Sequence, residues 1–234
     1  MKIALLGYGK MGKAIENIAL ERGHTIVLKT SEPIGDAIKN VDVAIDFSIP
    51  TAALNNISNC INHNVPVISG TTGWLENYDK AVDLCEEKKG AFIYASNFSL
   101  GVNVFFELNK TLAKMMASLK DYNVSLEEIH HTQKLDAPSG TAITLANAII
   151  EEHTEYNKWT LDSKSPNNSL PITAKRIENV PGTHSIEYKS NVDTIEIKHT
   201  AHSRDGFALG SVIAAEWIIG KAGVFTMKDV LNIS

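Results

Sequence analysis

The sequence contains only two cysteines among its 234 residues. Cys60 and Cys85 have no metal-ligand spacing and are too few for a disulfide framework, which excludes a disulfide-stapled fold and a cysteine-rich metal domain. Both fall in apolar stretches with helical periodicity, where we expect small buried hydrophobes rather than reactive thiols.

Positive charge is also scarce. Lysine and arginine total 22 against 27 acidic residues, and the formal net charge is −5. An acidic protein has no general attraction to nucleic acid or anionic membrane, so an anionic ligand needs a local cluster of positive charge. Long apolar runs are missing too: Ile3 to Leu6 is too short for a signal-peptide core or a membrane span. We therefore expect a cytoplasmic protein with neither a nucleic-acid nor a membrane partner.

The first part of the chain alternates apolar strands with amphipathic helices. The whole sequence is 44% hydrophobic and 21% charged, which is typical of a folded protein of one or two domains. Strands are predicted at 2–6, 25–29, 42–47, 65–69 and 91–95, and helices at 13–22, 51–62 and 75–89. This alternation over residues 1–101 predicts a parallel sheet covered by helices on both faces.

The pattern changes after residue 102. Helices are predicted at 103–119 and 141–153, a strand at 123–128, further strands near 172–178, 184–189 and 193–200, and a flexible loop at 154–170. The last two strands are spaced as a hairpin. Residues 102–205 therefore predict an α+β domain with an open mixed sheet. The apolar helix at 207–219 is expected to pack back on the first domain, so that residues 206–234 complete it.

A glycine-rich turn follows the first strand. Gly7, Gly9 and Gly12 form G-x-G-x-x-G between a strand and a helix, the context in which this motif binds the pyrophosphate of a dinucleotide. Tyr8, Lys10 and Met11 lie within the same turn. The alternative is an ordinary strand–helix turn without a ligand.

The second strand ends without the acidic residue that usually binds the ribose hydroxyls of NAD. Lys29, Thr30 and Ser31 stand there instead, and Glu32 comes late. These residues suit the 2′-phosphate of NADPH, although Lys29 equally fits a solvated charge at a strand end. NADPH and NADH therefore both remain candidate cofactors.

Three later loops follow predicted strands and are expected to line the same crevice. They contribute candidate cofactor contacts with small side chains, hydroxyls and backbone donors, although each also fits plain turn chemistry. These candidates are Phe47, Gly70, Thr71, Thr72, Ala95, Ser96, Asn97 and Phe98.

The densest chemistry lies in the segment HHTQKLDAPSGTA, which begins at His130. His130 and His131 offer proton transfer near neutral pH, and Lys134 offers a positive charge or, with a lowered pKa, an acid. The turn Ser139–Thr141, with Gly140 between, offers hydroxyls and free amides at a helix start, which suits a carboxylate or phosphate. A helix cap and surface histidines are the alternatives. No metal is expected, because adjacent strand residues point to opposite faces and no nearby cysteine or carboxylate set completes a site.

This segment, together with GYGKMG, GTTGW and SNFSLGVN, resembles the 4-hydroxy-tetrahydrodipicolinate reductase (dihydrodipicolinate reductase) family over nearly the whole chain. The resemblance implies reduction of that dicarboxylate with NADH or NADPH in lysine and diaminopimelate biosynthesis. It implies an N-terminal Rossmann-like domain and an α+β domain that binds substrate and forms a homotetramer through its sheet.

The resemblance also implies roles for single residues. His130 matches the proton donor and Lys134 the second catalytic residue, whereas His131, Ser139, Gly140 and Thr141 match substrate contacts. The glycine turn and the later strand-end loops match cofactor contacts.

One later signature departs from the family pattern: Arg176, Gly182 and His184 are present, but Glu178 replaces a usual glycine. We expect this departure to touch a loop beside the substrate and not the proton donor. Two other functions stay open, a nicotinamide-dependent enzyme acting on another small dicarboxylate or amino acid, and a dinucleotide sensor without catalysis.

Overall fold

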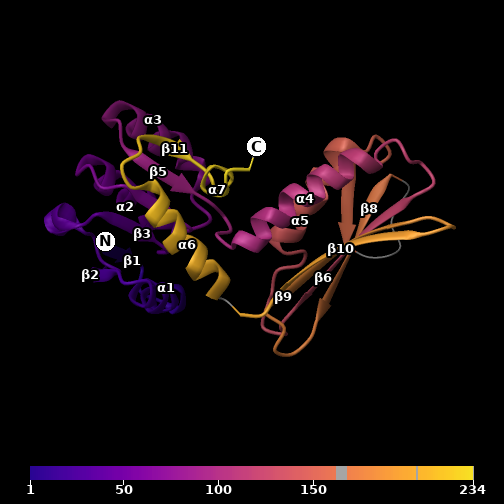
Figure 1. Ribbon diagram of the computed structural model, residues 1–234, viewed down its shortest axis with the longest axis horizontal. Coiled ribbons are helices and arrows are strands. Elements are labelled where there is room, and N and C mark those ends of the chain that lie inside the picture. Colours follow the sequence, from indigo (N-terminus) through magenta and orange to yellow (C-terminus); the bar gives the residue numbers. More distant parts are fainter. Residues whose placement is uncertain (162–167, 204, 234) are drawn as a thin grey trace. The chain divides into compact units, whose positions relative to one another are not determined.

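The computed structural model describes residues 1–161, 168–203 and 205–233. The chain divides into two compact units, Met1–Asn103 with Arg204–Ser234, and Val104–Ser203. The first unit is thus built from both ends of the chain, and the second is a continuous insertion into it (Figure 1).

The first unit contains a parallel sheet with the strand order β11-β5-β4-β3-β1-β2. The strands are β1 (Lys2–Leu6), β2 (Thr25–Thr30), β3 (Val43–Asp46), β4 (Val67–Ser69), β5 (Ala91–Tyr94) and β11 (Gly223–Phe225). All four residues of β3 are buried, as expected for a strand covered on both faces. The predicted parallel sheet is confirmed, and the edge strand β11 is an addition that the sequence did not predict.

Helices pack on both faces of this sheet. They are α1 (Lys10–Glu21), α2 (Pro50–Asn62), α3 (Tyr78–Lys88), α6 (Asp205–Ile218) and α7 (Met227–Leu231), with short 3-10 helices η1 (Gly35–Asn40) and η2 (Leu75–Asn77). One apolar cluster joins α1 and α6 to the sheet, and the other joins α2 and α3 to it. Both cysteines are free and buried in the second cluster, as predicted.

Helix α6 packs against α1, although the two are far apart in the sequence. Their contact is reinforced where Arg22 donates two hydrogen bonds of 2.8 and 2.7 Å to the carboxylate of Glu216. The C-terminal segment therefore completes the first unit.

The second unit contains a mixed sheet with the order β10-β9-β6-β8-β7. Its strands are β6 (Asn123–His130), β7 (Lys158–Leu161), β8 (Ser169–Arg176), β9 (Gly182–Lys189) and β10 (Thr194–Ala201). Side chains of α4 (Leu100–Met116) and α5 (Gly140–Glu152) join the apolar cluster of this unit. Along β6, Val124, Leu126, Glu128 and His130 are buried, while the alternating residues are only half-buried. The predicted open mixed sheet is confirmed.

The structure corrects several predicted boundaries. The loop predicted at 154–170 is wrong in part, because β7 lies within it and pairs in parallel with β8, whose first two residues also fall in this range. Residues 162–167 lie outside the described residues. Strand β6 runs two residues past its predicted end, since the amide of Ile177 donates a 2.8 Å hydrogen bond to the carbonyl of His130. Helix α4 begins at Leu100, because the side-chain amide of Asn103 donates hydrogen bonds to the carbonyls of Asn97 and Ser99 at its start.

Across the described ranges, the helices all fall short of the length and apolar character that crossing a membrane requires.

Candidate functional site

The glycine turn after β1 is built by close packing. Gly7 has a φ of +89°, and a Cβ there would lie 2.1 Å from the carbonyl oxygen of Phe47. A Cβ at Gly12 would lie 2.5 Å from the carbonyl oxygen of Gly7. These contacts leave no room for a side chain at either position. The backbone at the start of α1 therefore packs directly against the end of β1.

Gly9 plays a different part in the same turn. It is the N-cap of α1, no side chain caps the helix there, and a Cβ on it would meet nothing within 4 Å. The first amides of α1 therefore have open space beside them, and they lack partners within the helix. This combination fits a dinucleotide pyrophosphate.

Lys29 is not a free charge at the end of β2. Its ammonium lies 2.8 Å from the carboxylate of Glu16 and 5.1 Å from the ring centroid of Tyr8. The Tyr8 hydroxyl also donates a hydrogen bond to Glu16. Of the other predicted residues in the glycine turn, Lys10 is exposed and Met11 packs against the core. A 2′-phosphate would have to compete with Glu16 for Lys29, and the sequence analysis gave no role to Glu16.

The loops after β3 and β4 are tied together by Asp46. Its buried carboxylate accepts hydrogen bonds from the hydroxyls of Ser48 at 2.7 Å, Ser69 at 2.8 Å and Thr71 at 2.8 Å, and from the Asn56 amide at 2.9 Å. Burial raises the pKa of Asp46, while these bonds act in the opposite direction. The Thr71 hydroxyl is thus engaged inside the protein, and Thr72 is the exposed hydroxyl of this loop.

The remaining cofactor candidates divide between core and surface. Phe47 lies against Gly70, where a Cβ would be 2.3 Å from its ring, and its ring centroid is 5.8 Å from that of the buried Phe98. Ala95 is half-buried and Ser96 exposed. The side-chain oxygen of Asn97 accepts a 2.9 Å hydrogen bond from the Ser99 amide. Only part of this predicted set presents side chains at the surface.

In the second unit, a fully buried carboxylate lies beside the predicted proton donor. Glu128 is 0% exposed, and one of its oxygens, Oε1, lies 3.2 and 3.3 Å from two guanidinium nitrogens of Arg176. The other oxygen, Oε2, accepts a 3.0 Å hydrogen bond from the Ser139 amide. A buried carboxylate without such partners would cost several kcal/mol, so these contacts account for its presence.

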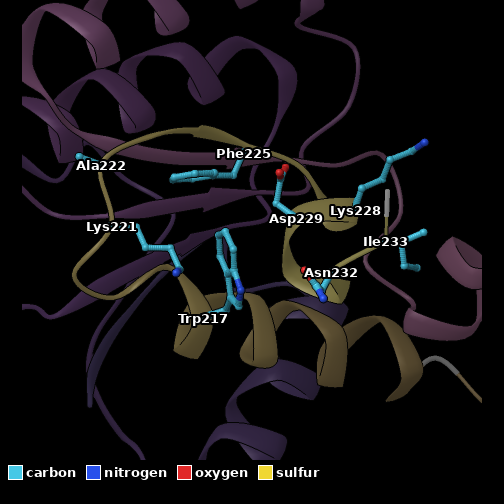
Figure 2. Close-up of a pocket in the computed structure, with 8 residues that line it drawn as sticks. All are labelled: Trp217, Lys221, Ala222, Phe225, Lys228, Asp229, Asn232 and Ile233. Atoms are coloured by element: carbon cyan, nitrogen blue, oxygen red, sulfur yellow. The ribbon is translucent and has the colours of Figure 1, made fainter.

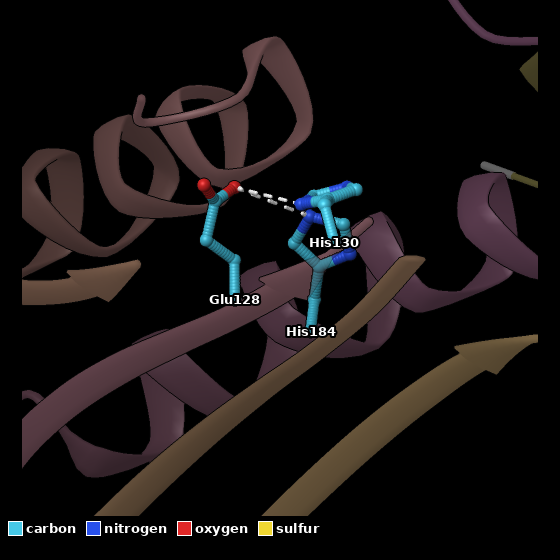
Figure 3. A group of neighbouring side chains, drawn as sticks. All are labelled: Glu128, His130 and His184. Carbon is cyan, nitrogen blue, oxygen red and sulfur yellow. Dashed lines mark ion pairs between the residues drawn. The ribbon is translucent and has the colours of Figure 1, made fainter. Parts of the chain in front are cut away.

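Two imidazoles face the same carboxylate oxygen (Figure 3). The Nδ1 atom of His130 is 3.6 Å from Glu128 Oε2, and the Nε2 atom of His184 is 3.8 Å from it. The two rings form an edge-to-face pair with centroids 5.0 Å apart, and His184 Nε2 lies 3.2 Å from the Ser139 hydroxyl. Burial lowers the pKa of both, that of His184 to about 4.

The signature residues Arg176, Gly182 and His184 lie beside the predicted proton donor. A Cβ on Gly182 would lie 3.1 Å from Nε2 of His130. Arg176 and His184 both contact the carboxylate of Glu128. Glu178, the departure from the family pattern, is exposed.

Lys134 lies in the loop after β6 and is paired. Its ammonium is 2.9 and 3.0 Å from the carboxylate oxygens of Asp136, and this contact lowers the pKa of Asp136. Arg176 holds the loop by donating to the carbonyls of Lys134 at 3.2 Å and Asp136 at 2.7 Å. Because Asp136 is largely exposed, its pair with Lys134 is weak enough for an anionic ligand to displace.

The start of α5 provides open amides. Ser139 is the N-cap, and its hydroxyl accepts a 3.2 Å hydrogen bond from Ala142. The helix-cap alternative is therefore correct for Ser139, yet Gly140 is exposed and a Cβ on it would meet nothing within 4 Å. The amides of Gly140 and Thr141 have no partner within the helix, which leaves them for an anion. Half-buried His131 follows β6 directly.

No cysteine or carboxylate set was expected to complete a metal site with the histidines, but one group with suitable spacing is present. Glu128, His130 and His184 each offer a ligand atom, and these atoms lie within 4.8 Å of one another. The carboxylate already pairs with a guanidinium and an amide, however, and a cation there would be repelled by Arg176. We therefore interpret the group as a hydrogen-bonding cluster.

Two surface hollows of the first unit are lined by other residues. One, of about 710 Å³, is formed by the end of α6, β11 and α7, with Trp217 and Phe225 edge to face in it (Figure 2). The other, of about 440 Å³, lies between the start of α2 and the Gly73–Asn77 segment. None of the predicted site residues lines either hollow.

Comparison with known proteins gives consistent matches over the whole chain. The family model for the dihydrodipicolinate reductase N-terminus matches residues 1–98, and that for its C-terminus matches residues 101–231. The 4-hydroxy-tetrahydrodipicolinate reductase of Christiangramia forsetii is 59% identical, covering 99% of this chain and 98% of the relative. That of Thermosipho africanus is 36% identical over the same shares.

A solved structure shares the fold. Dihydrodipicolinate reductase from Paenisporosarcina sp. TG-14, determined with dipicolinate bound, superposes with a TM-score of 0.77 at 22% identity, covering 97% of each chain.

The depressed pKa of His184 predicts a pH dependence of stability. The folded protein binds a proton at His184 only near pH 4, whereas an unfolded histidine titrates near its ordinary value of 6.5. Between these values the unfolded chain holds more protons, so the free energy of unfolding falls as pH falls, by up to about 3 kcal/mol at pH 4. His184→Gln should lose less stability than wild type between pH 6.5 and 4 in urea titrations. Equal losses in both proteins would contradict this origin.

Proposed function

Because the chain belongs to the dihydrodipicolinate reductase family, it reduces 4-hydroxy-tetrahydrodipicolinate with NADH or NADPH, and we propose that His130 donates the proton in this reaction. The activity belongs to lysine and diaminopimelate biosynthesis. The single observation that carries the assignment of His130 is its position, a buried imidazole between the Glu128 carboxylate and the bare Cα of Gly182.

The first unit is proposed as the dinucleotide-binding domain. The open amides at the start of α1, with Gly7, Gly9 and Gly12 around them, would hold the pyrophosphate, and the loops after β3, β4 and β5 would extend the site. When bound, the reduced nicotinamide supplies the hydride for the unsaturated ring of the substrate.

The second unit is proposed as the substrate domain. The amides of Gly140 and Thr141, with the Ser139 hydroxyl beside them, form one receptor for a carboxylate at the positive end of α5. Lys134 and His131 form the second, once the substrate displaces Asp136 from Lys134. A dianion is thus held by local positive charge in a protein whose net charge is negative.

Substrate binding also prepares His130 for proton transfer. Burial lowers the pKa of this imidazole in the free protein, whereas the Glu128 carboxylate raises it. Two substrate carboxylates add negative charge nearby, which favours the imidazolium. The 4-hydroxyl of the substrate leaves as water to give the unsaturated ring, and the hydride is added at C4. His130 then protonates the neighbouring carbon of the resulting enamine, and it regains its proton from solvent after product leaves.

The test of this role is the turnover of His130→Ala. Substrate would be generated in place from pyruvate and aspartate semialdehyde by the preceding enzyme, and loss of reduced nicotinamide would be followed at initial rates. Wild type should turn over, and His130→Ala should be slower by about 10²–10⁴-fold, the usual contribution of a general acid. His63→Ala, a histidine in the first unit paired with Asp36, is the matched control and should keep full activity. An unchanged rate in His130→Ala would remove the assigned role.

Cofactor preference should depend on the Glu16–Lys29 pair. Glu16→Gln removes the charge that occupies Lys29 and frees its ammonium for a 2′-phosphate. We expect the ratio of kcat/KM for NADPH to that for NADH to rise severalfold, measured with the same assay at low ionic strength. An unchanged ratio would mean that Lys29 does not face the adenosine ribose.

A homotetramer is proposed from the uncovered face of the second sheet. Ser125, Glu127 and Ile129 of β6 are only half-buried on that face, and β10 exposes most of its residues. Sedimentation at micromolar concentration should give about four times the chain mass of 25.5 kDa. A mass of one chain would contradict the proposal. We also propose a cytoplasmic location, supported by the two free thiols.

A further inference from the structure

We propose that Glu128 is the positioning residue of this reductase, with its carboxylate orienting the His130 imidazole and joining it to the carboxylate receptor at Ser139. The inference rests on the proposed proton transfer by His130. It concerns a residue that contacts the proton donor without contacting the reacting atoms.

The two carboxylate oxygens of Glu128 have different partners. Oε1 lies 3.2 and 3.3 Å from two guanidinium nitrogens of Arg176. Oε2 therefore remains available on the side where the reaction is proposed. Oε2 accepts the 3.0 Å bond from the Ser139 amide and lies 3.6 Å from Nδ1 of His130. One oxygen atom therefore links the start of α5 to the imidazole.

The imidazole of His130 has one nitrogen directed at this carboxylate. Its Nδ1 atom is buried without a hydrogen-bond partner, and Glu128 Oε2 is within about half an ångström of hydrogen-bond distance. Closing that gap places the Nδ1 proton on the carboxylate side and leaves Nε2 as the atom that exchanges the catalytic proton. Gly182 adjoins this nitrogen, and as a glycine it places no side chain over it.

The charges around the imidazole are balanced. Lys134 is paired with Asp136 and Arg176 with Glu128, and among the described residues His184 is a further titratable group that faces it. Removing the charge of Glu128 would leave Arg176 unopposed beside His130. The imidazolium would then be disfavoured, and the pKa of His130 should fall by about one unit or more.

The experiment compares Glu128→Gln, Glu128→Asp and Glu127→Gln. Glu127 is the neighbouring carboxylate on the opposite face of β6, paired with Lys175 at 2.5 Å, and its variant is the matched control. The pKa of His130 would be measured in the free protein by NMR titration of its ring, with the signal assigned from its absence in His130→Ala. The pH profile of kcat/KM would be measured in parallel.

In Glu128→Gln we expect the His130 pKa and the descending limb of the pH profile to move to lower pH together. A one-unit shift lowers kcat/KM at neutral pH about tenfold. Glu128→Asp, which keeps the charge, should recover much of the shift, and Glu127→Gln should match wild type. An unchanged His130 pKa in a folded Glu128→Gln protein would overturn the proposal, because a purely structural role would not move it.

Two further results separate the possible failures. If circular dichroism shows that both Glu128 variants are unfolded, the pKa of His130 would be measured in Arg176→Gln instead. Losing that cation should raise the His130 pKa. A fall or no change would overturn the proposal. If wild type shows no turnover, the proposed function fails, but the titration of His130 in the free protein still tests its contact with Glu128.

Discussion

The burial of one carboxylate organises the second unit. Glu128 has no contact with solvent, and moving such a charge out of water is tolerated only where donors replace its hydration. The donors come from separate segments, Arg176 at the end of β8 and Ser139 at the start of α5. Arg176 also holds the carbonyls of Lys134 and Asp136, so the loop that carries Lys134 is fixed through the same group. Removing the carboxylate would therefore loosen several elements of the proposed substrate site.

The first unit also contains a buried carboxylate that accepts several hydrogen bonds. Asp46, at the end of β3, is buried and accepts hydrogen bonds from side chains at the end of β4, in the following loops and in α2. In both units, therefore, a buried carboxylate lies near the end of a strand. Its hydrogen bonds fix the connecting loops that are proposed to bind a ligand. Hydroxyls that the sequence suggested as ligand contacts, such as that of Thr71, serve this internal role.

The sequence predicted the fold well where periodicity was strong. Both sheets and the helices that cover them follow from apolar spacing, whereas β7 and β11 were missed because each is short and lacks an alternating pattern. His130, Lys134 and Ser139 were found because they lie in one continuous segment. The partners of Glu128 were missed because they depend on strand register: Glu128 stands opposite His184, and His130 opposite Arg176. Spacing alone could have placed Glu128 and His130 on one face of β6, since they are two residues apart.

The most direct measurement is a crystal structure of the protein with NADH and dipicolinate, an unreactive analogue of the substrate. We predict one ligand carboxylate on the amides of Gly140 and Thr141 and the other on Lys134, with Asp136 displaced. Nδ1 of His130 should lie within hydrogen-bond distance of Glu128, and no ligand atom should touch that carboxylate. A ligand bound elsewhere, or one that contacts Glu128 directly, would contradict the role of Glu128 as the residue that positions the proton donor.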